Sequence, residues 1–156
     1  MKKWIIALAG LAALWAVHPF HGVDAGSLCV VETLLIETKS GQVQVAAGTL
    51  EGTGETVPEA LKDMAENTPG TLFLRQVRRI ILCGEQNGVQ RVMELPDEIP
   101  LGAIVYTSSK TAAELQTQDD LEQVMEAREQ RDRSMPNLAS IKNQWLERQK
   151  TGKAVG

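Results

Sequence analysis

The sequence contains very little histidine and few aromatic residues. Its 156 residues include two histidines, and aromatic side chains make up 4% of the chain. Both histidines, His18 and His21, lie in a stretch that we expect to be removed as a leader. The remaining chain then contains no histidine, which excludes nucleophiles of the Ser-His-Asp and Cys-His types and zinc sites built on histidine. Its aromatic residues, Phe73, Tyr106 and Trp145, are too few for a surface on which bases or sugars stack.

An excess of basic residues is also missing. The 16 Lys and Arg residues face 20 Asp and Glu residues, which gives a formal net charge of −4. Proteins that bind nucleic acids normally carry a clear basic excess, so we predict no nucleic-acid partner. An apolar content of 43% with 23% charged residues is typical of a globular protein, and the length fits one domain with an extension.

The first 25 residues have the pattern of a secretory signal. Two lysines precede an uninterrupted apolar run of 14 residues over 4–17. This run is short for a membrane-spanning helix, which needs roughly 20 apolar residues. Small residues around Ala25 suit cleavage before residue 26, and an uncleaved N-terminal anchor is the alternative. Cys29 does not fit a lipobox, so we expect no lipid anchor. The signal predicts an exported protein, either secreted or at the extracytoplasmic face of the membrane. Contact with the membrane is expected only through the leader, if the leader is not cleaved.

Two cysteines remain, Cys29 and Cys83, and each stands between apolar residues. Free cysteines in such surroundings usually behave as small buried apolar side chains. A disulfide between them is the alternative in an exported chain. The two cysteines are far apart and form no CxxC motif, the spacing that would favour a metal or redox role. We therefore predict no cofactor and no metal.

The pattern of apolar residues predicts an α+β domain over 26–116. Ser40-Gly41 is a turn between an apolar segment and an alternating one, which predicts a β-hairpin. The glycine-rich stretch 48–54 predicts a loop, and Thr56 with Glu59 predicts the capped start of a helix. We expect a small mixed sheet of about four strands with helices packed on it. The expected strands are 27–37, 42–45, 80–83 and 102–107, and the expected short helices are 89–95 and a Ser108-capped one ending at 115.

One basic cluster, formed by Arg75, Arg78 and Arg79, lies between two apolar segments. It could bind an anion or an acidic partner, and the alternative is a solvated edge or a set of partners for the acidic side chains of the domain. Asp97 and Glu98 are adjacent carboxylates on one loop bounded by prolines. General acid–base chemistry needs two carboxylates that converge from different elements, so we predict a turn and no catalytic residue there.

Residues 117–156 form a polar extension with two predicted amphipathic helices. The first is expected over 119–133, and the second carries Leu138, Ile141 and Trp145 at helical spacing. Helices with such narrow apolar stripes need a surface to dock on. For each helix, that surface is either the chain's own domain or a partner protein.

Four ordered stretches, 27–41, 54–61, 72–85 and 99–115, form a longer pattern. They are a first strand with its hairpin, the helix opening GETVPEAL, the apolar segment LFL followed by IILCGE, and a closing strand with a helix. Together they resemble the N-terminal domain of Ger(x)C-type spore germination proteins, the C subunits of germinant receptors. The lipobox cysteine usual in that family has no counterpart here.

The resemblance implies a non-enzymatic protein with a protein partner, such as other germinant receptor subunits. We therefore expect an exported protein-interaction module that acts in germination or sporulation complexes at the membrane. One alternative is a structural protein of the envelope or of a spore layer. Another is an enzyme that depends on a cysteine or a carboxylate, for which Cys83 and Glu85 are the candidates.

Overall fold

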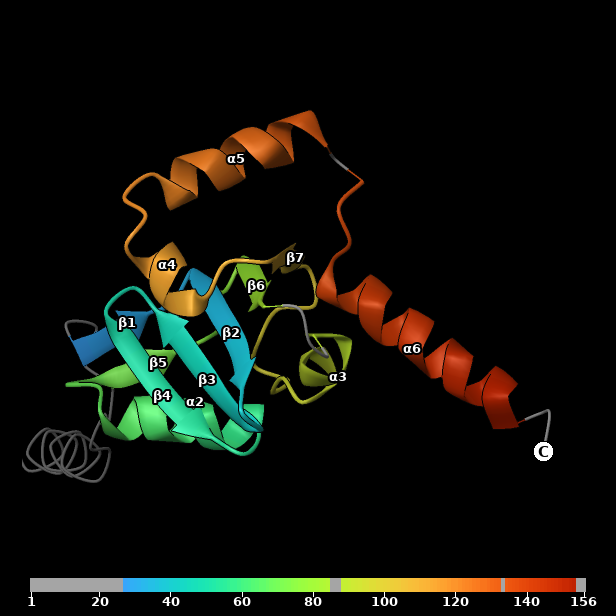
Figure 1. The fold of residues 1–156 in the computed structure, drawn as a ribbon, viewed down its shortest axis with the longest axis horizontal. Coiled ribbons are helices and arrows are strands. Elements are labelled where there is room, and N and C mark those ends of the chain that lie inside the picture. Colours follow the sequence, from blue (N-terminus) through green and yellow to red (C-terminus); the bar gives the residue numbers. More distant parts are fainter. Residues whose placement is uncertain (1–26, 85–87, 133, 154–156) are drawn as a thin grey trace, which may run out of the picture.

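The computed structural model describes residues 27–84, 88–132 and 134–153. The predicted signal over 1–25 and the candidate Glu85 lie outside the described residues. A five-stranded mixed sheet carries helices on both of its faces, and a two-stranded parallel sheet lies beside it (Figure 1). The predicted α+β class is confirmed.

The chain alternates short strands and helices from its first described element to its last. The strands are β1 (Leu28–Val30), β2 (Thr33–Lys39), β3 (Gln42–Ala47), β4 (Leu50–Gly54), β5 (Thr71–Phe73), β6 (Arg79–Cys83) and β7 (Ile104–Ser108). The helices are α2 (Val57–Glu66), α3 (Gly88–Met93), α4 (Ala112–Gln116), α5 (Leu121–Arg131) and α6 (Leu138–Lys153).

The five-stranded sheet has the order β4-β3-β2-β6-β7. Its first half is antiparallel, and β6 and β7 extend it in parallel. The predicted hairpin is confirmed, because Lys39 of β2 pairs with Gln42 of β3. Ser40 and Gly41 between them have φ angles of 53° and 84°. A two-residue type I′ turn needs positive φ at both positions, so the turn sequence fixes the hairpin register.

The loop predicted over 48–54 is wrong, because β4 occupies most of this stretch. A Cβ atom on Gly52 would collide with the backbone carbonyl oxygen of Ala60 and the backbone nitrogen of Met64 in α2. Glycine therefore stands here because a helix packs directly onto the strand. The sheet accordingly has five strands instead of about four.

Two other expected boundaries are also wrong. The single strand expected over 27–37 is divided, and its first part pairs with β5 while β2 begins at Thr33. The backbone carbonyl of Glu32 at this break accepts hydrogen bonds from the N–H groups of Arg78 and Arg79. The helix expected to be capped by Ser108 begins after Thr111, which forms a complete capping box with Glu114.

Side chains on the central strands alternate between two separate cores. On one face, Leu34 and Ile36 of β2 pack with the buried stripe of α2, whose predicted cap at Thr56 is confirmed. On the other face, Leu35 packs with residues of α4 and α5. This second core consists of Leu35, Ala46, Ile81, Cys83, Tyr106, Ala112, Leu115 and Met125.

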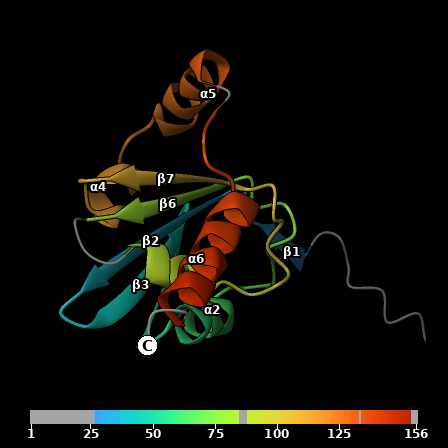
Figure 2. The same cartoon turned by 90° about the vertical axis from the view of Figure 1, so that its right-hand side faces the viewer.

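Helix α5 lies above α4 and β7, and α6 extends outward from the body of the fold (Figure 1). In the 90° view, α6 runs past α3 (Figure 2), and these two helices are in contact. The N–H groups of Leu138 and Ala139 donate to the backbone carbonyls of Ala103 and Leu101, which holds the first turn of α6 against the body. No helix among the described residues is both long and apolar enough to cross a membrane.

Candidate functional site: the sheet face under helix α5

Two rows of side chains stand on the face of the sheet that α5 covers. The strand register places Thr33, Arg79 and Ile104 side by side across β2, β6 and β7. Two residues further along each strand, and therefore on the same face, stand Leu35, Ile81 and Tyr106. The two rows bring a guanidinium and a phenol together on an otherwise apolar surface.

Arg79 is the centre of this cluster and is 5% exposed. Its Nε donates to Oε1 of Glu129 at 2.6 Å, and its Nη2 donates to Oε2 at 3.3 Å. The hydroxyl of Tyr106 donates to the same Oε1 at 2.7 Å. One carboxylate from α5 therefore meets both polar groups of the sheet, and the two-pronged contact with Arg79 is the strong form of this interaction.

The charges of the cluster are fixed at neutral pH. Hydrogen bonding to Arg79 holds the pKa of the Glu129 carboxyl below its usual range, and Tyr106 and Arg78 act in the same direction. Burial, followed by the hydrogen bond to Glu129, raises the pKa of Tyr106. The guanidinium of Arg128 stands 5.9 Å from the centre of the Tyr106 ring. Since none of the shifts in the Arg79–Glu129–Tyr106 cluster moves a group toward neutral pH, the cluster is suited to holding α5 and unsuited to proton transfer.

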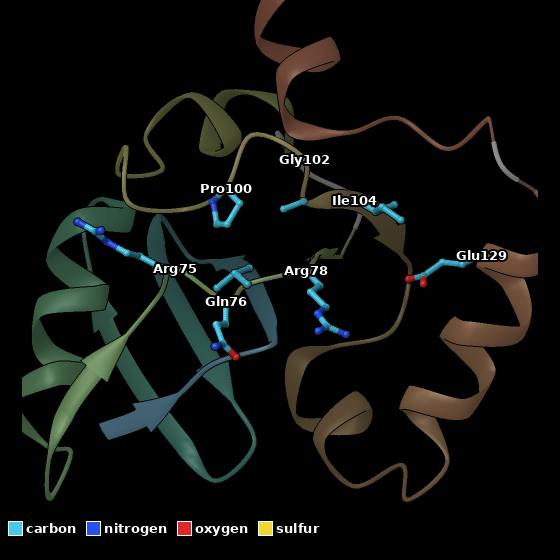
Figure 3. A pocket seen from close by; sticks show the side chains of 9 residues that line it. Arg75, Gln76, Arg78, Pro100, Gly102, Ile104 and Glu129 are labelled. Atoms are coloured by element: carbon cyan, nitrogen blue, oxygen red, sulfur yellow. The ribbon is translucent and has the colours of Figure 1, made fainter. Parts of the chain in front are cut away.

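An open cavity of about 530 Å³ lies next to the cluster. It is bounded by the loop between β5 and β6, by the segment before β7, and by Glu129 of α5. Figure 3 shows Arg75 and Glu129 at opposite ends of this cavity, with Arg78 between them. The side chains of Arg75 and Arg78 are exposed, so a solute that enters the cavity meets two positive charges.

The three arginines of the predicted cluster therefore do not share one face. Arg75 and Arg78 line the cavity, whereas Arg79 is the first residue of β6 and lies under α5. Glu129, Tyr106 and Thr33 were missed from the sequence. Glu129 stands four residues after Met125, the buried residue of α5, and this spacing was the available signal.

The cysteines occupy different environments. Cys83 is 4% exposed, and burial with the nearby charge of Glu37 raises the pKa of its thiol to about 12. Glu37 is itself buried and accepts a hydrogen bond from the N–H of Ala112 at the start of α4. Cys29 is partly buried, and both thiols are free, so the alternative of a disulfide is wrong. Cys83 is a buried side chain and carries little thiolate at neutral pH.

This environment predicts a large difference in thiol reactivity. At pH 8 in native buffer, Cys29 is expected to react with a thiol reagent on the order of a thousandfold faster than Cys83, because burial and the raised pKa both suppress the Cys83 thiolate. Mass spectrometry of the labelled peptides measures both rates. In guanidinium chloride the two rates should converge. Equal reaction rates of Cys29 and Cys83 in native buffer would contradict the burial of Cys83. The absence of labelled thiols after unfolding would contradict the assignment of both cysteines as free.

The side chains predicted for a partner helix divide between the core and the surface. Leu138 is fully buried, and Ile141 packs against the core on the α2 face. Trp145 is partly buried one turn further along α6, and Leu146 beside it is exposed. The first turn of α6 is thus anchored on the chain's own domain.

No group of three or more His, Cys, Asp or Glu side chains in the described parts of the chain could hold a metal ion. Asp97 and Glu98 lie together on an exposed turn between α3 and β7. Comparison with known proteins gives no significant match to a protein family, to a curated protein or to a solved structure.

Proposed function

We propose that this chain is an exported, non-enzymatic protein-interaction module that binds an acidic segment of a partner in a germination or sporulation complex at the membrane. The observation that carries the binding role is the open cavity with Arg75 and Arg78 on its wall. The germination context rests on the sequence resemblance to Ger(x)C proteins. The resembling stretches supply most of the strands of the core, so the likeness concerns the framework that holds the cavity.

The charges of the cavity favour a carboxylate ligand. Neither Arg75 nor Arg78 forms an ion pair with another described residue, although the charge of Arg78 acts on Glu129 nearby. A guanidinium binds a carboxylate through two parallel hydrogen bonds, and exposed positive charges also accelerate the approach of an acidic partner. On a chain with a net charge of −4, these arginines form a local positive surface.

The environment of Cys83 speaks against a cysteine-dependent enzyme. A thiol with a pKa of about 12 is protonated at neutral pH and cannot act as a nucleophile without a base that activates it. Glu37, the acidic residue whose charge acts on this thiol, points its Oε2 at the backbone of α4. Its carboxylate caps the start of α4 and is not directed into an open site.

The proposal predicts that reversing the two exposed charges removes the partner. A tagged protein is crosslinked in cells and purified separately from vegetative cells and from spores. Germinant receptor subunits are expected from spores alone, and the double variant Arg75→Glu/Arg78→Glu should lower their recovery by about tenfold or more. The matched control Lys39→Glu/Lys62→Glu changes the net charge equally at exposed positions outside the cavity and should keep the recovery unchanged.

Two outcomes would contradict the proposal. Equal recovery with both double variants would show that the cavity does not bind the partner. Purification of the chain with other copies of itself alone, together with concentration-dependent sedimentation, would favour the structural envelope or spore-layer protein.

A further inference from the structure

Helix α5 is held on the sheet by few side chains. Met125 is its only buried residue among those described, and Glu129 provides its close hydrogen bonds to the sheet. A second carboxylate, Glu126, stands 3.8 Å from Arg79 and is mostly exposed. The helix is therefore attached mainly by Met125, by the partly buried side chain of Leu121 and by the carboxylate of Glu129.

Two open cavities border α5, one at each end of the helix. The cavity of about 530 Å³ lies at its Glu129 end. A second cavity, of about 160 Å³, lies under its first turn, where Leu121 and Glu122 face Thr33 and Leu115. Both cavities are open to solvent, so the contact between α5 and the sheet face is accessible from each end of the helix.

An unpartnered hydroxyl lies in the smaller cavity. Oγ1 of Thr33 is buried and has no hydrogen-bond partner in the described structure. Buried polar groups almost always have a partner, and α5 places the apolar side chain of Leu121 in this cavity. A polar side chain at position 121 would place a hydrogen-bonding group in the cavity that Thr33 lines.

The positions along α5 define what this face can hold. Leu121, Met125 and Glu129 are spaced by four residues, so they lie on one side of the helix. The helix crosses the strands from Thr33 of β2, at its start, to Ile104 of β7, beside Glu129. This is the arrangement by which a groove binds a helix, with anchors one and two turns apart.

We propose that the sheet face under α5 is a binding groove for an acidic partner helix, and that α5 occupies this groove in the free protein. The partner helix carries a glutamate for Arg79 and Tyr106, an apolar residue four positions before it, and a polar residue eight positions before it for Thr33. This inference rests on the proposed function and identifies the partner segment of that same site.

The exchange of one helix for another keeps every buried charge paired. The partner carboxylate enters the larger cavity past Arg75 and Arg78 and takes the place of Glu129 on Arg79. Glu129 then moves into water with α5. Because Arg79 holds a carboxylate before and after the exchange, the groove never leaves a buried guanidinium without its counter-charge.

A peptide with the sequence of α5 tests the groove. The probe is a fluorescent peptide of residues 117–132, titrated against the full chain and against its Glu129→Gln variant. The variant weakens the hold of the resident helix and leaves the groove unchanged, so it should bind the peptide about tenfold or more tightly than the wild-type chain. The same variant should show faster amide hydrogen exchange in α5 and unchanged exchange in the sheet.

Matched peptides identify the contacts. A Glu129→Gln peptide should bind the variant chain about tenfold or more weakly than the parent peptide, whereas an Asp132→Asn peptide with the same loss of charge should bind as the parent does. A Leu121→Gln peptide should bind more tightly than the parent. Arg79→Met in the Glu129→Gln chain should abolish binding, and circular dichroism checks that this chain is folded.

The groove assignment fails if the wild-type chain and its Glu129→Gln variant bind the parent peptide equally, or if the peptide's Glu129→Gln change has no effect. A Leu121→Gln peptide that binds no more tightly would remove Thr33 from the groove. Dimerisation of the Glu129→Gln chain would assign the groove to a second copy of this protein.

If the peptide fails to bind while charge reversal still removes the cellular partner, the groove is wrong and the proposed function stands. If the peptide binds while no partner is recovered from cells, the groove stands and the proposed germination partner is wrong.

Discussion

Replacing Gly52 by alanine is expected to lower the free energy of unfolding by about 3 kcal/mol. The added Cβ would collide with backbone atoms of Ala60 and Met64, which cannot move aside as a flexible side chain can. Relief requires α2 to shift away from β4, and this opens the core in which Leu61 and Met64 are buried. Unfolding in guanidinium chloride, followed by circular dichroism, measures the loss.

Gly102→Ala is the matched control for this substitution. A Cβ at Gly102 meets no atom within 4 Å, so the same chemical change should alter stability by less than about 0.5 kcal/mol. A loss below about 1 kcal/mol at Gly52 would mean that α2 can shift away from the strand at little cost, contrary to the close packing of these two elements.

Replacing Ile80 by alanine is expected to cost about 3 to 4 kcal/mol. Ile80 is fully buried at the centre of the sheet, and the register places it between Leu34 of β2 and Val105 of β7. Both neighbours belong to hydrogen-bonded strands, so the cavity left by the missing side chain cannot collapse. Denaturant unfolding with an unchanged slope would show that the loss lies in the stability of the folded state.

Val124→Ala provides the comparison on the outer surface. Val124 is 47% exposed on α5, and its truncation should change the free energy of unfolding by less than about 0.5 kcal/mol. Equal losses at Ile80 and Val124 would contradict the assignment of β6 to the centre of the core.

Local signals in the sequence predicted the elements that depend on local chemistry. The Ser40-Gly41 turn predicted the hairpin, and the cap at Thr56 predicted the start of α2. The run at 80–83 predicted β6 because four successive apolar residues fit a strand that is buried on both faces. In each case the residues that specify the structure are neighbours along the chain.

The missed features depend on residues that are distant in the sequence. The glycines of 48–54 predicted a loop because glycine is common in loops. The actual reason for Gly52 is the close contact of β4 with α2, which the sequence does not show. The pairing of Arg79 with Glu129 joins positions 50 residues apart, and neither residue carries a local mark of its partner. Arg79 was grouped with Arg75 and Arg78 because sequence proximity does not show that β6 begins at Arg79.

The placement of α6 has a practical consequence for the design of fusion proteins. Its first turn is fixed to the segment before β7, and its later turns project away from the sheet (Figure 1). A helix of 16 residues is about 24 Å long, so α6 adds a spacer of this length to the body of the fold. An affinity tag or a fluorescent protein joined behind α6 is therefore separated from the first turn of α6 by the length of this helix.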